Sequence, residues 1–91
     1  MLDLIFTTKF KKDYKRMRKR GKDKKKLEDT LDMLMKGIPL PKDYHDHELQ
    51  GRYIGFRECH IEPDWLLIYA INQEELILVA SRTGSHSDLF T

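Results

Sequence analysis

Residues 44–90 contain all four histidines of this chain and its only tryptophan. They fall in three short segments, 44–51, 56–65 and 81–90. Imidazole, with an unperturbed pKa of about 6.5, is the side chain that both accepts and donates a proton near neutral pH. The second half of the chain therefore has the residue types of an active site.

Metal-free cleavage of a phosphodiester is one reaction that these residue types fit. It needs a base, an acid and a donor that stabilises charge on the non-bridging oxygens. Two histidines and Arg82 have the chemistry for these three roles. Asp64 is able to orient a neighbouring imidazole or to raise its pKa. Trp65 and Phe90 offer aromatic faces on which unpaired RNA bases stack.

Each residue also has a purely structural explanation. Trp65 opens an apolar segment, so it fits a core position at least as well as a stacking role. Asp64 follows a proline, as turn residues often do, and Arg82 has many carboxylates with which to pair. We interpret His45 as polar loop surface. The clustering of the other residues, rather than any one of them, favours an active site.

A zinc site is the competing interpretation. His45, His47, His60, Asp64 and His86 are all chemically competent zinc ligands. Their scattered spacing is less specific than paired cysteines or an H-E-x-x-H motif, and the chain has one cysteine. We therefore expect no metal and no cofactor.

The size and composition of the chain predict one small domain. It has 91 residues, of which 40% are hydrophobic and 35% charged. The apolar run 65–71 is far shorter than the roughly 20 residues of a membrane span, and we expect no signal peptide or membrane anchor. The single Cys59 cannot form an internal disulfide, which favours the cytoplasm.

The net charge of +2 conceals a strongly basic segment. Residues 9–26 hold 12 Lys and Arg against two Asp, a local charge of +10, and the rest of the chain carries −8. Such a segment suits a polyanion, although a solvated helix surface explains it about equally well. The candidate contacts with an RNA backbone are Lys11, Lys15, Arg18, Lys22 and Lys25.

The basic segment is predicted to form two helices. Thr7 or Thr8 is a plausible N-cap for the first helix, which ends near Gly21. Asp23 can cap the second, which ends at Gly37. Because the link between them is short, we expect an antiparallel hairpin.

Strands are predicted at residues 2–6, 52–61, 65–71 and 75–82, and residues 38–49 are predicted to be a structured loop. The order is β-α-α-β-β-β. The expected fold class is α+β, with an antiparallel sheet covered on one face by both helices.

The alternation of the strands indicates which side chains could meet. In the last strand, Ala80 and Arg82 are predicted to share a face. If His60 points to the same side, it lies beside Arg82, and the turn at Gly84 brings His86 back towards both.

Three strings carry a family resemblance: DHELQG, ECHIEPDWLLIY and RTGSHSDLF. They resemble the YafQ branch of the RelE/ParE toxin superfamily, without gaps through most of residues 43–90. The resemblance implies one RelE-like domain over residues 1–91. It also implies a ribosome-dependent, metal-independent mRNA endoribonuclease of a type II toxin–antitoxin system, which inhibits translation in the cytoplasm.

The resemblance also implies residue roles and partners. The substrate's 2′-hydroxyl would attack the adjacent phosphate, and the expected partners are mRNA, the ribosome and a cognate antitoxin in a hetero-oligomer. The basic hairpin would hold ribosomal RNA, and an acidic antitoxin segment would suit it. By position, the catalytic residues would be His47, His60, Asp64 and His86, the phosphate contact Arg82, and the substrate-placing aromatics Trp65 and Phe90.

A non-enzymatic binder is the alternative class of protein. It could be a ParE-like gyrase poison on the same scaffold, or a small basic nucleic-acid-binding module. A structural subunit with incidental histidines is a third possibility. We favour the enzyme because a pure binder has no chemical need for the histidine set.

Overall fold

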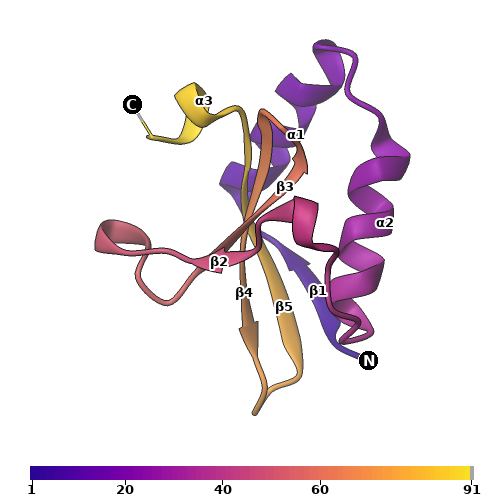
Figure 1. Cartoon of the computed structure of the whole chain (residues 1–91), viewed down its shortest axis with the longest axis vertical. Coiled ribbons are helices and arrows are strands. Elements are labelled where there is room, and N and C mark those ends of the chain that lie inside the picture. Colours follow the sequence, from indigo (N-terminus) through magenta and orange to yellow (C-terminus); the bar gives the residue numbers. More distant parts are fainter. Residues whose placement is uncertain (91) are drawn as a thin grey trace.

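The computed structural model describes residues 1–90 (Figure 1). The elements are β1 (Asp3–Phe6), α1 (Thr8–Lys19), α2 (Lys24–Met35), β2 (His47–Glu48), β3 (Arg57–Glu62), β4 (Trp65–Asn72), β5 (Ile77–Gly84) and α3 (His86–Phe90), with 3-10 turns at Lys42–Tyr44 and Gly51–Tyr53. The sheet has the order β1-β5-β4-β3-β2. The predicted α+β class is confirmed.

The sheet is mixed rather than wholly antiparallel. β1 pairs with β5 in parallel, and every other pair is antiparallel. Parallel strands need a long crossover connection, and the two helices together with β2, β3 and β4 supply it. The prediction of an antiparallel sheet is therefore wrong for β1, because local residue patterns do not show the direction in which a distant strand pairs.

The two helices begin and end where the sequence predicts. The side chains of Thr7 and Asp23 cap α1 and α2 by accepting backbone N–H bonds at 3.0 and 2.9 Å. The chain leaves the helices through Gly21 and Gly37, whose φ angles of +85° and +72° suit glycine. In Figure 1 the chain rises through α1 and returns through α2.

The main core lies between the helices and one face of the sheet. Trp65 is fully buried within it and donates its indole N–H to the hydroxyl of Thr83 at 2.9 Å. The buried side chains of this core are Phe10, Met17, Leu27, Leu31, Leu34, Cys59, Trp65, Leu67, Tyr69, Leu78 and Ala80.

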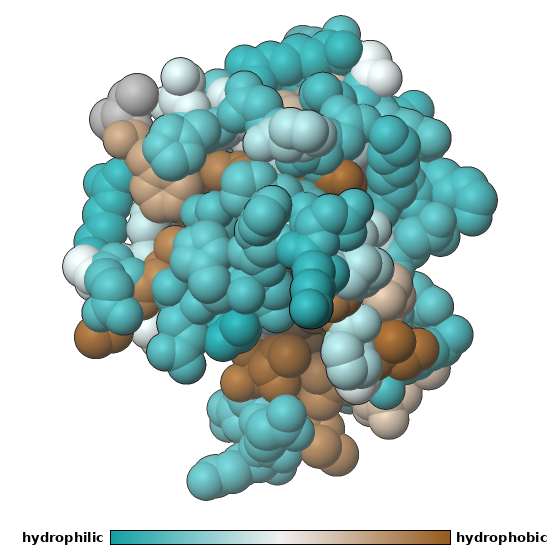
Figure 2. Space-filling view, viewed as in Figure 1, coloured by the Kyte–Doolittle hydropathy of each residue, from teal (hydrophilic) through white to brown (hydrophobic). Residues whose placement is uncertain are grey.

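The opposite face of the sheet carries a second, smaller apolar cluster. Leu66, Ile68 and Leu89 are its buried members, and α3 and residues 49–56 cover them. Figure 1 shows these two segments on the side of the sheet away from α2. Figure 2 shows a mostly hydrophilic surface, in which apolar groups gather over the lower part of β4 and β5. The sheet face that α3 partly covers is the one that carries Glu58, His60 and Arg82.

A β-bulge in β5 determines which side chains reach that face. Ile68 pairs with Arg82 and the next residue, Tyr69, pairs with Ala80, so Ser81 is an extra residue. Ala80 therefore packs in the main core, whereas Arg82 lies on the other face opposite Ile68. The prediction that Ala80 and Arg82 share a face is wrong, because strict alternation does not allow for a bulge.

The N-cap residue of α1 hydrogen-bonds to the backbone of this bulge. The hydroxyl of Thr7 donates to the carbonyl of Ser81 at 2.7 Å, and its backbone N–H donates to that of Ala80 at 3.2 Å. The residue that caps α1 thus also satisfies the carbonyl that the bulge displaces.

Four other features differ from the prediction, and the first is that β5 spans Ile77–Gly84 rather than 75–82. The strand predicted at 52–61 begins only at Arg57, because Gly51 and Gly55 have φ angles of +66° and +91° and interrupt an extended chain. β2 forms inside the predicted loop, and α3 was not predicted. No helix within residues 1–90 is long and apolar enough to cross a membrane.

The indole of Trp65 provides a test of the main core. We expect Trp65→Phe to lower the free energy of unfolding by about 1–3 kcal/mol, because the substitution removes a buried hydrogen bond to Thr83. Urea unfolding followed by circular dichroism measures this. Thr83→Ser, which keeps the hydroxyl, should cost less. Equal stability of Trp65→Phe and wild type would show that the bond is not stabilising.

Candidate active site

One row of paired residues crosses the sheet face that α3 partly covers. His47 pairs with Glu58, Glu58 with Ile68, and Ile68 with Arg82. Directly paired residues point to the same side, so all four share this face. Glu58 and Arg82 are two strands apart, about 10 Å. His60 lies on this face two residues beyond Glu58, so it and Arg82 do point to the same side.

The Glu58 carboxylate lies beside two of the histidines, His47 and His60. Its side chain is 7% exposed, and its Oε1 lies 3.3 Å from Nε2 of His60 and 4.0 Å from Nε2 of His47. The other ring nitrogen of His60 lies 3.2 Å from the carbonyl of Pro63. Both ring nitrogens of His60 thus lie close to oxygen atoms, one of Glu58 and one of the Pro63 backbone, which fixes the orientation of the ring.

The segment that carries His47 is tied to the sheet through Asp46. That carboxylate accepts from the hydroxyl of Tyr69 at 2.6 Å and from Nε of Arg57 at 3.2 Å. His47 Nδ1 lies 2.7 Å from the carbonyl of His45, which directs its Nε2 towards Glu58. The ring of His45, interpreted from the sequence as loop surface, is exposed but lies 5.6 Å from that of His60.

Two titratable groups of the main core, behind the site face, are held neutral. Burial raises the pKa of the Cys59 thiol to about 12. Burial, followed by the hydrogen bond to Asp46, raises the pKa of Tyr69. Neither group is a proton carrier at neutral pH.

α3 presents His86, and a reciprocal cap starts this helix. Ser85 and Asp88 each accept the backbone N–H of the other, at 3.2 and 2.9 Å. Gly84 permits this close turn, because a Cβ there would lie 3.0 Å from Asp88. Asp64 accepts the backbone N–H of His86 at 2.9 Å, so it positions the peptide rather than the imidazole.

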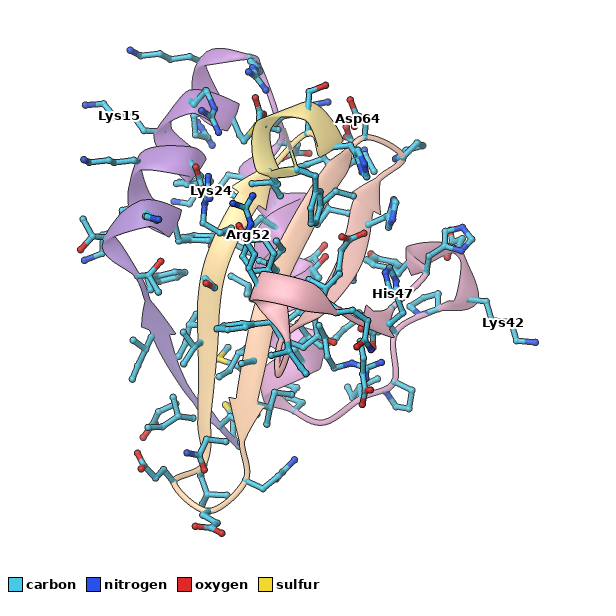
Figure 3. The ribbon with its side chains drawn as sticks, turned by 90° about the vertical axis from the view of Figure 1, so that its left-hand side faces the viewer. Lys15, Lys24, Lys42, His47, Arg52 and Asp64 are labelled. Atoms are coloured by element: carbon cyan, nitrogen blue, oxygen red, sulfur yellow. The ribbon has the colours of Figure 1, made fainter. Side chains whose placement is uncertain are left out.

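Aromatic rings line the site between α3 and the 3-10 turn at Gly51–Tyr53. The exposed His86 ring lies 5.0 Å from that of Phe90, and Phe90 lies 5.8 Å from Tyr53 in an edge-to-face contact. Figure 3 views this side of the molecule, with Asp64 beside α3, Arg52 in the centre and His47 near β2. Phe90 is half-buried and keeps an accessible surface.

Ion pairs fasten both α3 and Arg82 to α1. Arg20 donates to Asp88 at 2.6 and 3.1 Å, and this interaction holds the pKa of Asp88 well below its usual range. Arg82 donates to Asp13 through Nε at 2.6 Å and Nη2 at 3.1 Å, a bidentate pair. The hydrogen bond to Asp13 raises the pKa of Arg82.

The five basic residues proposed to contact RNA divide into two groups. Lys22 pairs with Glu62 at 2.8 Å and Lys25 with Asp29 at 3.3 Å, so protein carboxylates already engage these two lysines. Figure 3 shows Lys15 pointing away from the sheet. Three residues are exposed along one stripe of α1 and make no ion pair within residues 1–90: Lys11, Lys15 and Arg18.

The structure brings most of the predicted site residues to one side of the sheet, with one exception. Trp65 lies in the main core with 0% exposure, so no base can stack on its ring, and the proposed substrate contact is wrong for this residue. Four residues at the site were not predicted from the sequence: Asp13, Tyr53, Glu58 and Asp88. Of these, only Asp88 had a clear sequence signal, because Ser85-x-x-Asp88 is a capping box.

Comparisons with known proteins place this geometry in a class of small bacterial toxins. The family model described as "Bacterial toxin of type II toxin-antitoxin system, YafQ" matches residues 2–91. The mRNA interferase toxin YafQ of Escherichia coli K12 is 42% identical over 89 residues, which cover 97% of this chain and 95% of that protein.

Solved structures agree with this placement. A chain of the E. coli DinJ–YafQ complex superposes with a TM-score of 0.90 at 40% identity, over 100% of both chains. A metal-bound toxin from Helicobacter pylori superposes with a TM-score of 0.93 at 44% identity, over 99% of this chain and 100% of that one. The fold and the site thus define a RelE-like toxin. This chain belongs to the YafQ family of bacterial toxins of type II toxin–antitoxin systems.

The metal-bound relative makes the donor set of this chain relevant. Across residues 1–90, no three His, Cys, Asp or Glu side chains are arranged to hold a metal ion. The four histidines do not converge, because His47 and His60 lie beside Glu58, the ring of His45 contacts that of His60, and His86 is on α3. We therefore assign no step to a metal.

The lowered pKa of Asp88 leads to a pH-dependent prediction. Its carboxylate stabilises the fold above its unfolded pKa of 3.8, and this contribution disappears as the pH falls further. We expect Asp88→Asn to cost about 1 kcal/mol at pH 7, since Arg20 is 43% exposed and solvent screens the pair. The deficit should shrink below about pH 4.

Urea unfolding of both proteins at pH 7, 5 and 3 measures this difference. The exposed Asp29, paired with Lys25, provides the control Asp29→Asn, which should change stability little at any pH. A deficit for Asp88→Asn that is the same at pH 7 and pH 3 would contradict the assignment.

Proposed function

We propose that this chain is an mRNA endoribonuclease that cuts translated mRNA on the ribosome in the cytoplasm. The observation that carries the proposal is a single sheet face that bears His47, His60 and the tightly held Arg82, beside a basic helix. The E. coli relative, named an mRNA interferase toxin, supports the same activity.

The proposed reaction uses the substrate's own 2′-hydroxyl as the nucleophile. A base removes its proton, the 2′-oxygen bonds to the adjacent phosphorus, and the bond from phosphorus to the 5′-oxygen breaks. An acid protonates that leaving oxygen. The products are a 2′,3′-cyclic phosphate, which can open to a 3′-phosphate, and a 5′-hydroxyl.

Proton transfer is assigned to the histidines on two sides of the site. His86, exposed at the start of α3, is one proton carrier, and His60 or His47 beside Glu58 is the other. Arg82 stabilises the negative charge that develops on the phosphate. Asp64 holds the peptide of His86 in place.

Phe90 is the aromatic group proposed to place the substrate. Its ring lies between His86 and Tyr53 and retains partial exposure, so a splayed base can stack on it next to the proton carrier. Trp65 has no part in this proposal because it lies on the opposite face.

The basic helix is proposed to contact ribosomal RNA. Its unpaired stripe of Lys11, Lys15 and Arg18 is the part best suited to phosphates. We also propose a cognate antitoxin as partner in a hetero-oligomer, because E. coli YafQ is found in a complex with DinJ. An acidic antitoxin segment would complement the +10 segment.

The role of His86 is tested by its removal. We expect His86→Ala to slow the cleavage of ribosome-bound mRNA by about 10²–10⁴-fold, the usual contribution of a positioned acid or base. The wild-type profile of rate against pH should be bell-shaped. If the variant loses the rise on the acidic side, His86 is the base, and if it loses the fall on the basic side, His86 is the acid.

A rapid-quench assay on programmed ribosomes measures the rate, and mass spectrometry identifies the product ends. Gln73→Ala, in the exposed β4–β5 turn, should cut at the wild-type rate. If His86→Ala also cut at that rate, His86 would not be a proton carrier.

The basic stripe is tested by the salt dependence of ribosome binding. We expect Lys11→Ala/Lys15→Ala to reduce the slope of log affinity against log salt by about 2, one unit for each lost phosphate contact. Lys25→Ala/Lys36→Ala removes the same charge from lysines already paired with Asp29 and Asp32, and should change the slope less. Equal changes in both pairs would mean that the stripe is not a contact surface.

A further inference from the structure

Asp13 is the one acidic residue of α1, and it is buried where its basic neighbours are exposed. It is 5% exposed. A carboxylate out of water is unfavourable unless charged or polar partners surround it. Its burial therefore depends on the groups that it contacts.

Each carboxylate oxygen of Asp13 accepts two hydrogen bonds. One oxygen accepts from Nε of Arg82 at 2.6 Å and from the backbone N–H of Thr83 at 3.2 Å. The other accepts from Nη2 of Arg82 at 3.1 Å and from Arg16 at 3.2 Å. Asp13 thus holds the side of the guanidinium that carries Nε and Nη2.

The remaining nitrogen of Arg82, Nη1, makes no bond to Asp13 and donates one long hydrogen bond to the hydroxyl of Tyr53, which a phosphate oxygen can replace. Nη1 lies 3.4 Å from the hydroxyl of Tyr53, at the edge of the aromatic group formed with Phe90. The Arg82 side chain is 19% exposed. Any phosphate that reaches Arg82 on this face meets a guanidinium whose plane is already fixed.

We propose that Asp13 is a positioning residue for RNA cleavage. It fixes the guanidinium plane of Arg82 so that Nη1 donates to a non-bridging phosphate oxygen as charge develops in the transition state. The inference rests on the proposed function, because it gives Arg82 a phosphate to contact. Without Asp13, the flexible arginine would have to be ordered during the reaction, or would bind the ground state as well as the transition state.

The same ion pairs continue to the other side of the site. Arg16 lies between Asp13 at 3.2 Å and Asp88 at 3.8 Å, and Asp88 holds the start of α3. Through this chain of charges, α1 fixes Arg82 and the helix that carries His86 relative to each other. Asp13 is the member of the chain that contacts Arg82 directly.

The first experiment compares Asp13→Asn with the matched surface variant Asp29→Asn in single-turnover cleavage on ribosomes. We expect Asp13→Asn to lower kcat by about 10²-fold with little change in KM, since a misplacement of about 1 Å costs that much. Asp29→Asn should match wild type. A folded Asp13→Asn protein with wild-type kcat overturns the proposal.

A double-mutant cycle separates positioning from a general effect on folding. If Asp13 acts through Arg82, then Asp13→Asn/Arg82→Ala should be as slow as Arg82→Ala alone. A further 10²-fold loss in the double variant overturns the proposal. If Arg82→Ala itself cuts at the wild-type rate, the phosphate role of Arg82 fails. If Arg82→Ala is slow but folded Asp13→Asn is not, only the present inference fails.

Wild-type protein provides a second measurement in case Asp13→Asn does not fold. In ¹H–¹⁵N spectra, the Nε–H of Arg82, assigned by its loss in Arg82→Lys, should be a sharp signal that exchanges slowly with solvent. It should remain so when a nucleoside 3′-monophosphate is added. A rapidly exchanging, averaged signal would show that Asp13 does not hold the guanidinium and overturns the proposal.

Discussion

A single extra residue in β5 places Arg82 on the same sheet face as the histidines of the site. Without the bulge at Ser81, strand alternation would send Arg82 into the same core as Ala80. With it, Arg82 lies opposite Ile68, on the face that also carries His60. The hydroxyl of Thr7 bonds to the bulged carbonyl, so the start of α1 and the placement of the arginine are parts of one interaction.

The basic helix α1 therefore has two different faces. Its exposed stripe is the surface that we propose contacts RNA, while its buried side holds Arg82 through Asp13. Arg20 adds the bond to Asp88 that fastens α3. The positive charge that we propose contacts ribosomal RNA and the ion pairs that order the site thus belong to the same helix and its C-cap residue.

The sequence predicted features that depend on local chemistry. The caps at Thr7 and Asp23, the main strands and the RelE-like class followed from residue types, spacing and resemblance. It did not predict the bulge, because no residue type marks Ser81 as extra. It also placed Trp65 at the substrate, although burial against Thr83 depends on tertiary packing. Asp13 escaped notice because its partner lies 69 residues away.

The central claim, that this chain cuts translated mRNA, is tested most directly by sequencing 5′ ends after the chain is expressed without an antitoxin. The account predicts new 5′-hydroxyl ends inside translated reading frames, in register with codons, and none in untranslated RNA. Growth arrest with intact mRNA and broken DNA would contradict it and would indicate a gyrase poison on the same scaffold.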